Sequence, residues 1–308
     1  MQLFVIGNGF DIAHGLSTRY TDFRSYIEGK SWSFLSRFEE LYGFYSDGDK
    51  NPAEDYLWID FENNLSEIRE EILVDSGTSI ELDLESGDVG ILDTLDAYWE
   101  QEYGFIEELQ NYLYEWVSNI NIVVDRKTQL IKEDCDDLYL TFNYTSVLED
   151  VYRVDSGRIL HIHGSLNELD DRPIIGHGNS EKIKNMKRLA IEAANKFYEK
   201  EESIYRAISN YYTRTLKDVS PIIAFNQHFF QKLSKVTRIH IIGTSLGGVD
   251  MPYFNEIKES TEENTIWNIY CYYPQDMSIF VEKIKSLGVN EENIIALDTS
   301  KFFNLKKP

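Results

Sequence analysis

The stretches LYLTFNYT (residues 138–145) and ILHIHGS (residues 159–165), separated by a short helical pattern, decide the fold of this chain. Each begins with apolar residues in the alternating pattern of a buried strand, and each ends in polar residues that predict a turn. In open α/β sheets, ligands bind beyond the carboxyl ends of the strands. We therefore expect Asn143 and His163, which follow these strands, to belong to the functional site.

The N-terminal segment LFVIGNGFDIAHGL (residues 3–16) predicts a strand, a glycine turn and a helix that Asp11 is placed to cap. Gly7, Asn8 and Gly9 form a turn that suits a phosphate group, because glycine permits positive φ and close approach of the backbone. The spacing falls short of the full GxGxxG fingerprint, so an ordinary tight turn remains the alternative.

The C-terminal third continues the alternation of strands and helices, with strands at residues 238–246, 265–272 and 293–297. Such alternation implies parallel pairing, so we predict an α/β fold with a doubly wound, mainly parallel, Rossmann-like sheet. The turn GTSLGGVD (residues 243–250) places Gly243, Thr244 and Ser245 beyond a strand, where they can contact a ribose or a phosphate. Asp250 is expected to cap the helix that follows.

Helical spacing of apolar residues fills most of the remaining sequence. We expect a single domain over residues 1–308, with a large helical insertion at about residues 20–130 and a second helical segment at about residues 181–233. The polar stretch at residues 75–93 is expected to be a loop. The helical region is either a plain insertion into the α/β core or a lid over its ligand-binding edge.

The composition limits the class of protein and its partners. The chain has 308 residues, 42% of them hydrophobic, which is enough for a globular core. Its net charge of −23 argues against nucleic acid, whose binding depends on Lys and Arg, although backbone amides can still hold a dinucleotide. The chain shows no signal-peptide pattern and no apolar run near the roughly 18 residues of a membrane helix. We expect a cytoplasmic protein without a membrane partner.

Few residues of the sequence are candidates for a catalytic or binding role. The amide of Asn143 can donate and accept hydrogen bonds, and so can hold a ribose hydroxyl, a carboxamide or a water, although Asn is also a common turn residue. His163 is a candidate general base, and His161 a core histidine. The two histidines share one face, but no further ligand lies at a familiar metal-binding spacing. Cys135 and Cys271 are isolated thiols, so we expect no metal site.

Four stretches, in this order, resemble motifs of the sirtuin-type NAD-binding fold: the opening glycine turn, TFNY (residues 141–144), HGS (residues 163–165) and GTSL (residues 243–246). Together with IIGHGNS (residues 174–180), they resemble the bacterial abortive-infection AbiH family, which is associated with defence against phage. This closer resemblance spans nearly the whole chain.

The resemblance implies roles for individual residues. Asn143 would lie in the nicotinamide and ribose pocket, and His163 would contact the nicotinamide ribose as the base. Further residues are candidates for binding NAD: Gly7, Asn8, Gly9, Asp11, Thr141, Gly164, Ser165, His177, Gly243, Thr244 and Ser245. For His177, a plain turn residue is the alternative. The chain lacks the four-cysteine zinc module of sirtuin deacylases, and Tyr144 and Thr145 depart from the deacylase strand end. Protein deacylation is therefore not expected.

Without an acyl-lysine acceptor, water is the obvious nucleophile. The main hypothesis is an NAD glycohydrolase that acts in phage defence, with NAD as its substrate. One alternative is a non-catalytic module that senses a nucleotide or binds a partner. Another is a metal-dependent nuclease that uses Asp11, Glu62 and His177. A second copy of the chain or another defence protein is compatible with each hypothesis as a partner.

Overall fold

The computed structural model describes residues 1–45, 52–79, 91–167 and 171–303. These residues contain a parallel sheet of six strands in the order β3-β2-β1-β4-β5-β6. The strands are β1 (Gln2–Ile6), β2 (Leu138–Thr141), β3 (Ile159–His161), β4 (Arg238–Ile242), β5 (Ile266–Cys271) and β6 (Ile294–Asp298). The predicted α/β fold with a doubly wound parallel sheet is confirmed.

Helices make up most of the remaining described structure. The α-helices are α1 (Asn8–Ala13), α2 (Tyr20–Lys30), α3 (Trp32–Glu40), α4 (Ala53–Tyr56), α5 (Phe61–Asn64), α6 (Glu70–Ser79), α7 (Ile91–Tyr103), α8 (Glu108–Ser118), α9 (Val147–Asp150), α10 (Ser180–Asn195), α11 (Glu199–Arg214), α12 (Val219–Phe225), α13 (Gln227–Lys232), α14 (Met251–Ser260) and α15 (Met277–Lys285). The short 3-10 helices are η1 (Gly104–Glu107), η2 (Ser156–Arg158), η3 (Leu233–Lys235), η4 (Pro274–Asp276), η5 (Glu291–Asn293) and η6 (Thr299–Lys301).

The chain forms two compact units. The sheet unit comprises Met1–Arg19, Tyr114–Ile174 and Asp218–Pro308, and the helical unit comprises Tyr20–Leu113 and Ile175–Lys217. These bounds differ from the expected helical segments at about residues 20–130 and 181–233. Beyond the end of α8, Ile120, Ile122 and Val124 pack against the core of the sheet unit instead of continuing a helix.

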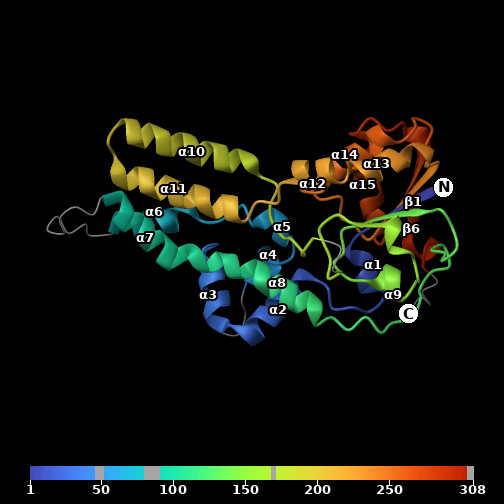
Figure 1. The fold of residues 1–308 in the computed structure, drawn as a ribbon, viewed down its shortest axis with the longest axis horizontal. Coiled ribbons are helices and arrows are strands. Elements are labelled where there is room, and N and C mark those ends of the chain that lie inside the picture. Colours follow the sequence, from blue (N-terminus) through green and yellow to red (C-terminus); the bar gives the residue numbers. More distant parts are fainter. Residues whose placement is uncertain (46–51, 80–90, 168–170, 304–308) are drawn as a thin grey trace. The chain divides into compact units, whose positions relative to one another are not determined.

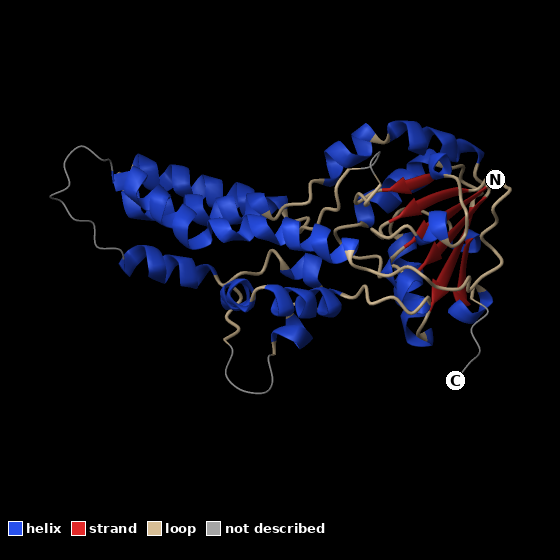
Figure 2. Cartoon of the chain, turned by 60° about the horizontal axis from the view of Figure 1, so that its bottom comes forward, coloured by secondary structure: helices blue, strands red, loops and turns tan. Residues whose placement is uncertain are grey.

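The sheet is covered on both faces because its strands bury side chains on both sides, as parallel strands do. On one face, Leu3 and Val5 of β1 share a core with residues of α13, α14 and α15. On the other face, Phe4 and Ile6 share a core with residues of α1, α9 and the segment after η6. Figure 2 shows the strands side by side with helices on both faces. All strands point their carboxyl ends toward the same edge, where the candidate site lies.

The helical unit is built around an antiparallel pair, α10 and α11, which lie side by side (Figure 1). Asn179 caps α10 by accepting a hydrogen bond from Lys182 N. Helices α6 and α7 pack against α11. Among the described residues, we find no helix whose length and apolar character would let it cross a membrane.

One expectation about this unit is wrong. Residues 75–79, predicted as loop, continue α6, and α7 begins at Ile91; residues 80–90 of the predicted loop lie outside the described part of the chain. Gly77 explains the difference, because a Cβ at this position would lie 2.4 Å from a side-chain atom of Ile204 in α11. The small residue allows close packing of two helices, and this packing outweighs the poor helix propensity of Gly and Ser.

Candidate functional site

The order in which strands are added to the sheet reverses at its centre, beside β1. From β1 the chain proceeds outward to β2 and β3, and it then returns to β4 on the other side of β1. In α/β proteins, this reversal creates a crevice at the carboxyl ends of the strands, and dinucleotides bind across it in folds with the order 3-2-1-4-5-6. The two predicted glycine turns follow β1 and β4, and so lie at this point.

The two glycine turns pack directly on each other. Gly7 N donates to Ile242 O and Gly9 N donates to Gly243 O, each over 2.8 Å. A Cβ on Gly9 would lie 2.7 Å from Gly243 Cα, which explains why a larger residue does not fit. Asn8 is also engaged, because its Nδ2 donates to Thr18 O over 2.7 Å. The amides of Gly7 and Gly9, predicted to hold a phosphate, are therefore bonded within the protein.

Replacing Gly243 by alanine is expected to destabilise the sheet unit strongly. Gly243 has a φ of +70°, and a Cβ there would lie 2.4 Å from Phe10 N. Gly15→Ala is the matched control, because Gly15 has a φ of +87° but open space around it. The positive φ alone costs about 1–2 kcal/mol, so in urea denaturation Gly243→Ala should lose clearly more stability than Gly15→Ala. Equal losses would show that the two turns can separate without cost.

A cavity of about 520 Å³ opens beside these turns. It is lined by Gly9, Ile12, Ala13, Arg19, Gly243, Thr244, Ser245, Tyr270, Tyr272, Tyr273, Asp276, Phe280, Thr299 and Phe303. Tyr272 and Tyr273 follow β5 and are 70% and 55% exposed, so aromatic faces remain available to a ligand. Mostly apolar walls with a few polar groups are typical of small-molecule sites. The cavity thus brings together four predicted cofactor-binding residues, those contributed by the two glycine turns.

Helix α1 also carries a buried carboxyl group, that of Asp11. Asp11, expected to cap α1, lies inside this helix, whose N-cap position is taken by Gly7. Thr145 Oγ1 donates to Asp11 Oδ2 over 2.7 Å, and the side-chain amide of Asn143 also lies close to the carboxyl. Thr141 Oγ1 accepts from Asn143 N over 3.0 Å and so fixes the turn after β2. The structure therefore joins three predicted residues, Asp11, Thr141 and Asn143, through Thr145 and the backbone of this turn.

Burial dominates the electrostatics of Asp11. The side chain is 1% exposed, and loss of solvent raises the pKa of its carboxyl to about 7. The hydrogen bond from Thr145, the amide of Asn143 and the charge of His161 act in the opposite direction but do not compensate. Asp11 can therefore exchange a proton near neutral pH.

His161 supports the same turn from β3. Its Nδ1 donates to Asn143 O over 2.9 Å, and its Nε2 lies 2.9 Å from Glu149 Oε1 of α9. Both ring nitrogens thus face oxygen acceptors, which an imidazolium ring satisfies by donating to both. His161 is a buried structural histidine, as expected, but it is directly linked to the backbone of Asn143.

His163 lies two residues beyond β3 and has different neighbours. Its Nε2 is 3.5 Å from Asp250 Oδ1, and its ring packs against Phe142 and Tyr253 at centroid distances of 5.1 and 5.6 Å. Asp250, expected to cap α14, occupies the N-cap position without a capping hydrogen bond. Its backbone is already helical (φ −93°, ψ −14°), whereas a capping residue is usually extended. The carboxylate instead faces the imidazole.

The residues after His163 form a tight turn. Gly164 has a φ of +80°, and a Cβ there would lie 2.3 Å from Arg172 O. Ser165 N donates to Asp171 O over 2.9 Å, and Ser165 Oγ accepts from Asn167 N over 3.0 Å. These contacts fix the backbone that carries His163.

His177 and Glu62 belong to the helical unit. His177 Nδ1 accepts from Asn179 N and its Nε2 donates to Tyr212 O, each over 3.0 Å, while burial lowers the pKa of His177 to about 4. Glu62 Oε1 lies 2.7 Å from Lys217 Nζ. Within the described ranges, no group of three or more His, Cys, Asp or Glu side chains could hold a metal ion.

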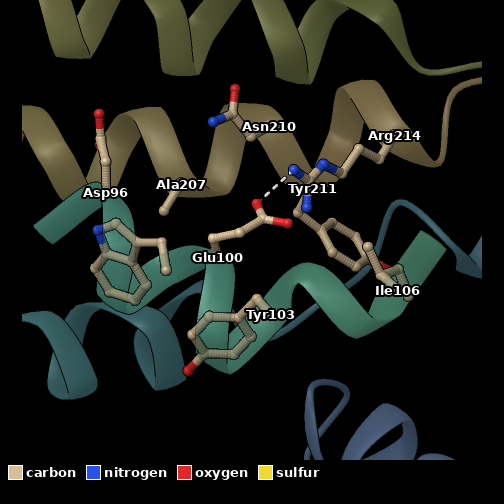
Figure 3. A pocket seen from close by; sticks show the side chains of 9 residues that line it. Asp96, Glu100, Tyr103, Ile106, Ala207, Asn210, Tyr211 and Arg214 are labelled. Carbon is tan, nitrogen blue, oxygen red and sulfur yellow. Dashed lines mark hydrogen bonds and ion pairs between the residues drawn. The ribbon is translucent and has the colours of Figure 1, made fainter. Parts of the chain in front are cut away.

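The helical unit has a small cavity of its own, of about 180 Å³, between α7 and α11 (Figure 3). Trp99, Tyr103 and Tyr211 contribute aromatic walls. An ion pair between Arg214 Nη2 and Glu100 Oε2, 2.7 Å apart, lies among the lining side chains. Sequence analysis singled out none of these residues.

Comparison with known proteins decides the family. The family model described as bacteriophage abortive infection AbiH matches residues 3–272 of the 308-residue chain. The chain belongs to the AbiH family. This confirms the predicted resemblance to the AbiH family and makes the chain a phage abortive-infection protein. No curated protein and no solved structure matches it.

The AbiH match includes every residue that sequence analysis proposed for the site, and also Asp250. Part of the cavity wall lies beyond the matched region, namely Tyr273, Asp276, Phe280, Thr299 and Phe303. The segment after residue 272 thus lines one part of a cavity whose other lining residues lie within the AbiH match.

Sequence analysis missed several residues of this AbiH site. Tyr272 and Tyr273 follow β5 directly, but the predicted strand, residues 265–272, included Tyr272. Thr145 and Glu149 could not be recognised from the sequence, because their roles depend on hydrogen-bond partners in other elements. Thr145 bonds to Asp11 of α1, and Glu149 bonds to His161 of β3. Arg19 lies between the N-terminal segment, residues 3–16, and the helical insertion expected from about residue 20, so it belonged to neither pattern.

Proposed function

We propose that this AbiH-family protein is an NAD glycohydrolase with a sirtuin-like NAD-binding core. One observation carries the proposal: the aromatic cavity is lined by residues that follow β1, β4 and β5, while Asn143 and His163 follow β2 and β3, so all of them lie at the carboxyl edge of one sheet. A dinucleotide bound across this edge would have one nucleoside in the cavity and the other beside Asn143 and His163.

The dimensions of the sheet suit such a ligand. Strands β5 and β2 are separated by three strand spacings, which amounts to roughly 14 Å. In the proposed complex, adenine stacks on the tyrosines after β5, and Thr244 and Ser245 contact its ribose. Arg19 supplies positive charge for the pyrophosphate in an otherwise acidic protein.

The chemistry at the other end is hydrolysis of the bond between nicotinamide and ribose. Water adds to the ribose carbon, the C–N bond breaks through an oxocarbenium-like transition state, and nicotinamide leaves with the bonding electron pair. His163 takes the proton released by the water or by a ribose hydroxyl, and Asp250 stabilises the resulting imidazolium. Asn143 orients the ribose or the water. The products are nicotinamide, ADP-ribose and a proton, and loss of NAD halts an infected cell.

A nucleotide-sensing module is the second candidate. Asn143 and His163 are 7% and 3% exposed. Such burial favours a site that binds a ligand and reports its presence without turning it over. Binding of NAD without release of nicotinamide would support this candidate.

The experiment is an assay of nicotinamide release by the full chain, alone and with an extract of phage-infected cells. Asn143→Ala should reduce the rate at least about 100-fold, because a misplaced reacting group typically costs that much. Asn185→Ala changes an exposed residue of α10 and should leave the rate unchanged. Full activity in Asn143→Ala, or no release under either condition, would contradict the proposal.

A further inference from the structure

The turn after β2 is held from two sides. On one side, His161 Nδ1 donates to the backbone carbonyl of Asn143, and Glu149 fixes the other ring nitrogen. On the other side, the side-chain amide of Asn143 faces the carboxyl of Asp11, which Thr145 holds by a 2.7 Å hydrogen bond. These contacts hold the backbone of Asn143 and place its side-chain amide next to the carboxyl of Asp11.

The carboxyl and the amide form an incomplete pair. Asp11 Oδ1 and Asn143 Nδ2 are both buried, and neither completes a hydrogen bond of ordinary geometry. A buried donor and a buried acceptor that lack partners are costly, so their proximity here needs a specific explanation. The Asn143 amide is nevertheless close enough to favour the charged form of Asp11.

We propose that Asp11 is the positioning residue of Asn143: its carboxylate holds the Nδ2 end of the amide, so that the amide oxygen is presented to the substrate. This inference rests on the proposed glycohydrolase function for its effect on rate, but the contact itself does not. An ionised Asp11 only accepts hydrogen bonds, so it favours the amide orientation in which the Nδ2 group of Asn143, a donor, points toward it. A protonated Asp11 can donate to the amide oxygen and would turn the amide around. The active orientation therefore requires loss of the Asp11 proton.

Few titratable groups surround Asp11. His161 faces it from the end of β3, and Glu149 of α9 lies behind His161. His14, the C-cap residue of α1, donates to Phe10 O and accepts from Tyr152 Oη, and burial lowers the pKa of His14. Burial therefore favours the neutral form of His14.

The contact can be tested without any enzyme assay. In protein labelled with 15N-asparagine, the side-chain NH₂ signals of Asn143, assigned by their loss in Asn143→Asp, should shift with a midpoint near pH 7, the value of the raised Asp11 pKa. The shift should vanish in Asp11→Asn. It should persist in Asp137→Asn, which alters another buried carboxylate of the sheet unit that accepts a hydrogen bond from Gln2 N. Signals that do not change with pH would overturn the proposal.

Stability gives a second measure that is independent of NAD. Since the Asp11 pKa is raised from 3.8 to about 7, the folded chain keeps a proton that the unfolded chain has lost. The contribution of this proton to the stability of the folded chain is complete below pH 3.8 and disappears as the pH rises through about 7. Asp11→Asn should therefore be more stable than the wild type at pH 8, with no such gain at pH 4. Equal pH dependence in both proteins would contradict a raised pKa.

The effect on rate distinguishes positioning from a general structural role. Asp11→Asn should lower kcat for nicotinamide release roughly 10- to 100-fold, with little change in KM. Thr145→Val removes the bond that favours the charged carboxylate, so the acidic limb of the kcat profile should move to higher pH, and Thr145→Ser should restore it. Identical limbs in the two Thr145 variants would overturn the role of Asp11. If the wild type releases no nicotinamide, the glycohydrolase function fails, while the NMR titration still decides whether Asp11 holds Asn143.

Discussion

Replacing His163 by alanine is expected to reduce nicotinamide release by about 10²–10⁴-fold, the usual contribution of a general base. The side chain lies at the carboxyl edge of the sheet, and its Nε2 is 3.5 Å from Asp250 Oδ1. Removing it eliminates the proposed proton acceptor but leaves the aromatic cavity, which His163 does not line, intact. Calorimetry should therefore show that His163→Ala still binds ADP-ribose, although its rate of NAD hydrolysis falls.

Two variants make this result specific. His228→Ala alters an exposed histidine of α13 and should keep the wild-type rate. Asp250→Asn keeps the shape of the side chain that faces His163 but removes its charge. The imidazolium formed in the reaction would then be less stabilised, so the rate should lie between those of the wild type and His163→Ala. A His163→Ala protein with full activity would exclude this residue as the base, whatever its effect on stability.

Replacing Arg24 by methionine is expected to destabilise the helical unit by about 3–5 kcal/mol, because it leaves a buried carboxylate without its cation. Arg24 Nε lies 2.7 Å from Glu39 Oε1, and the two side chains are 2% and 3% exposed. Trp58 Nε1 donates to the same Glu39 oxygen over 2.8 Å. Urea denaturation, followed by tryptophan fluorescence, measures the loss.

Combining Arg24→Met with Glu39→Gln should recover much of this stability, since the neutral amide needs no cation and still accepts from Trp58. Arg188→Ala is the matched control: Arg188 pairs with Glu192 on the surface of α10, where both side chains are about half exposed. Its loss should be below about 1 kcal/mol. If the two arginine variants lose equal stability, or the double variant recovers none, burial of the charge is not what makes Arg24 important.

The architecture was largely predictable because parallel strands buried on both faces leave a strong apolar signal. The segments around Leu3, Leu138 and Ile239 each carried that signal, and each is a strand. The helix boundaries were less predictable. Residues 75–79 are rich in Gly and Ser, and they are helical only because Gly77 permits contact with Ile204, a residue far away in the sequence.

The candidate site was predictable where a residue follows a strand, and less so where its role depends on a distant partner. Asn143 and His163 were proposed from position alone, and the structure places both beyond the ends of β2 and β3. Asp11 and Asp250 were recognised as polar residues near helix starts, where capping is the common role. Their carboxylates instead contact Thr145 and His163, and these pairings arise only when the strand ends are brought together.

The most direct test of the account is a structure of the full chain bound to ADP-ribose. We predict that the adenine contacts Tyr272 in the cavity beside Gly9 and Gly243, and that the terminal ribose lies next to Asn143 and His163. A ligand bound with its adenine outside that cavity, or with its terminal ribose away from both side chains, would contradict the claim that one dinucleotide spans the carboxyl edge of this sheet.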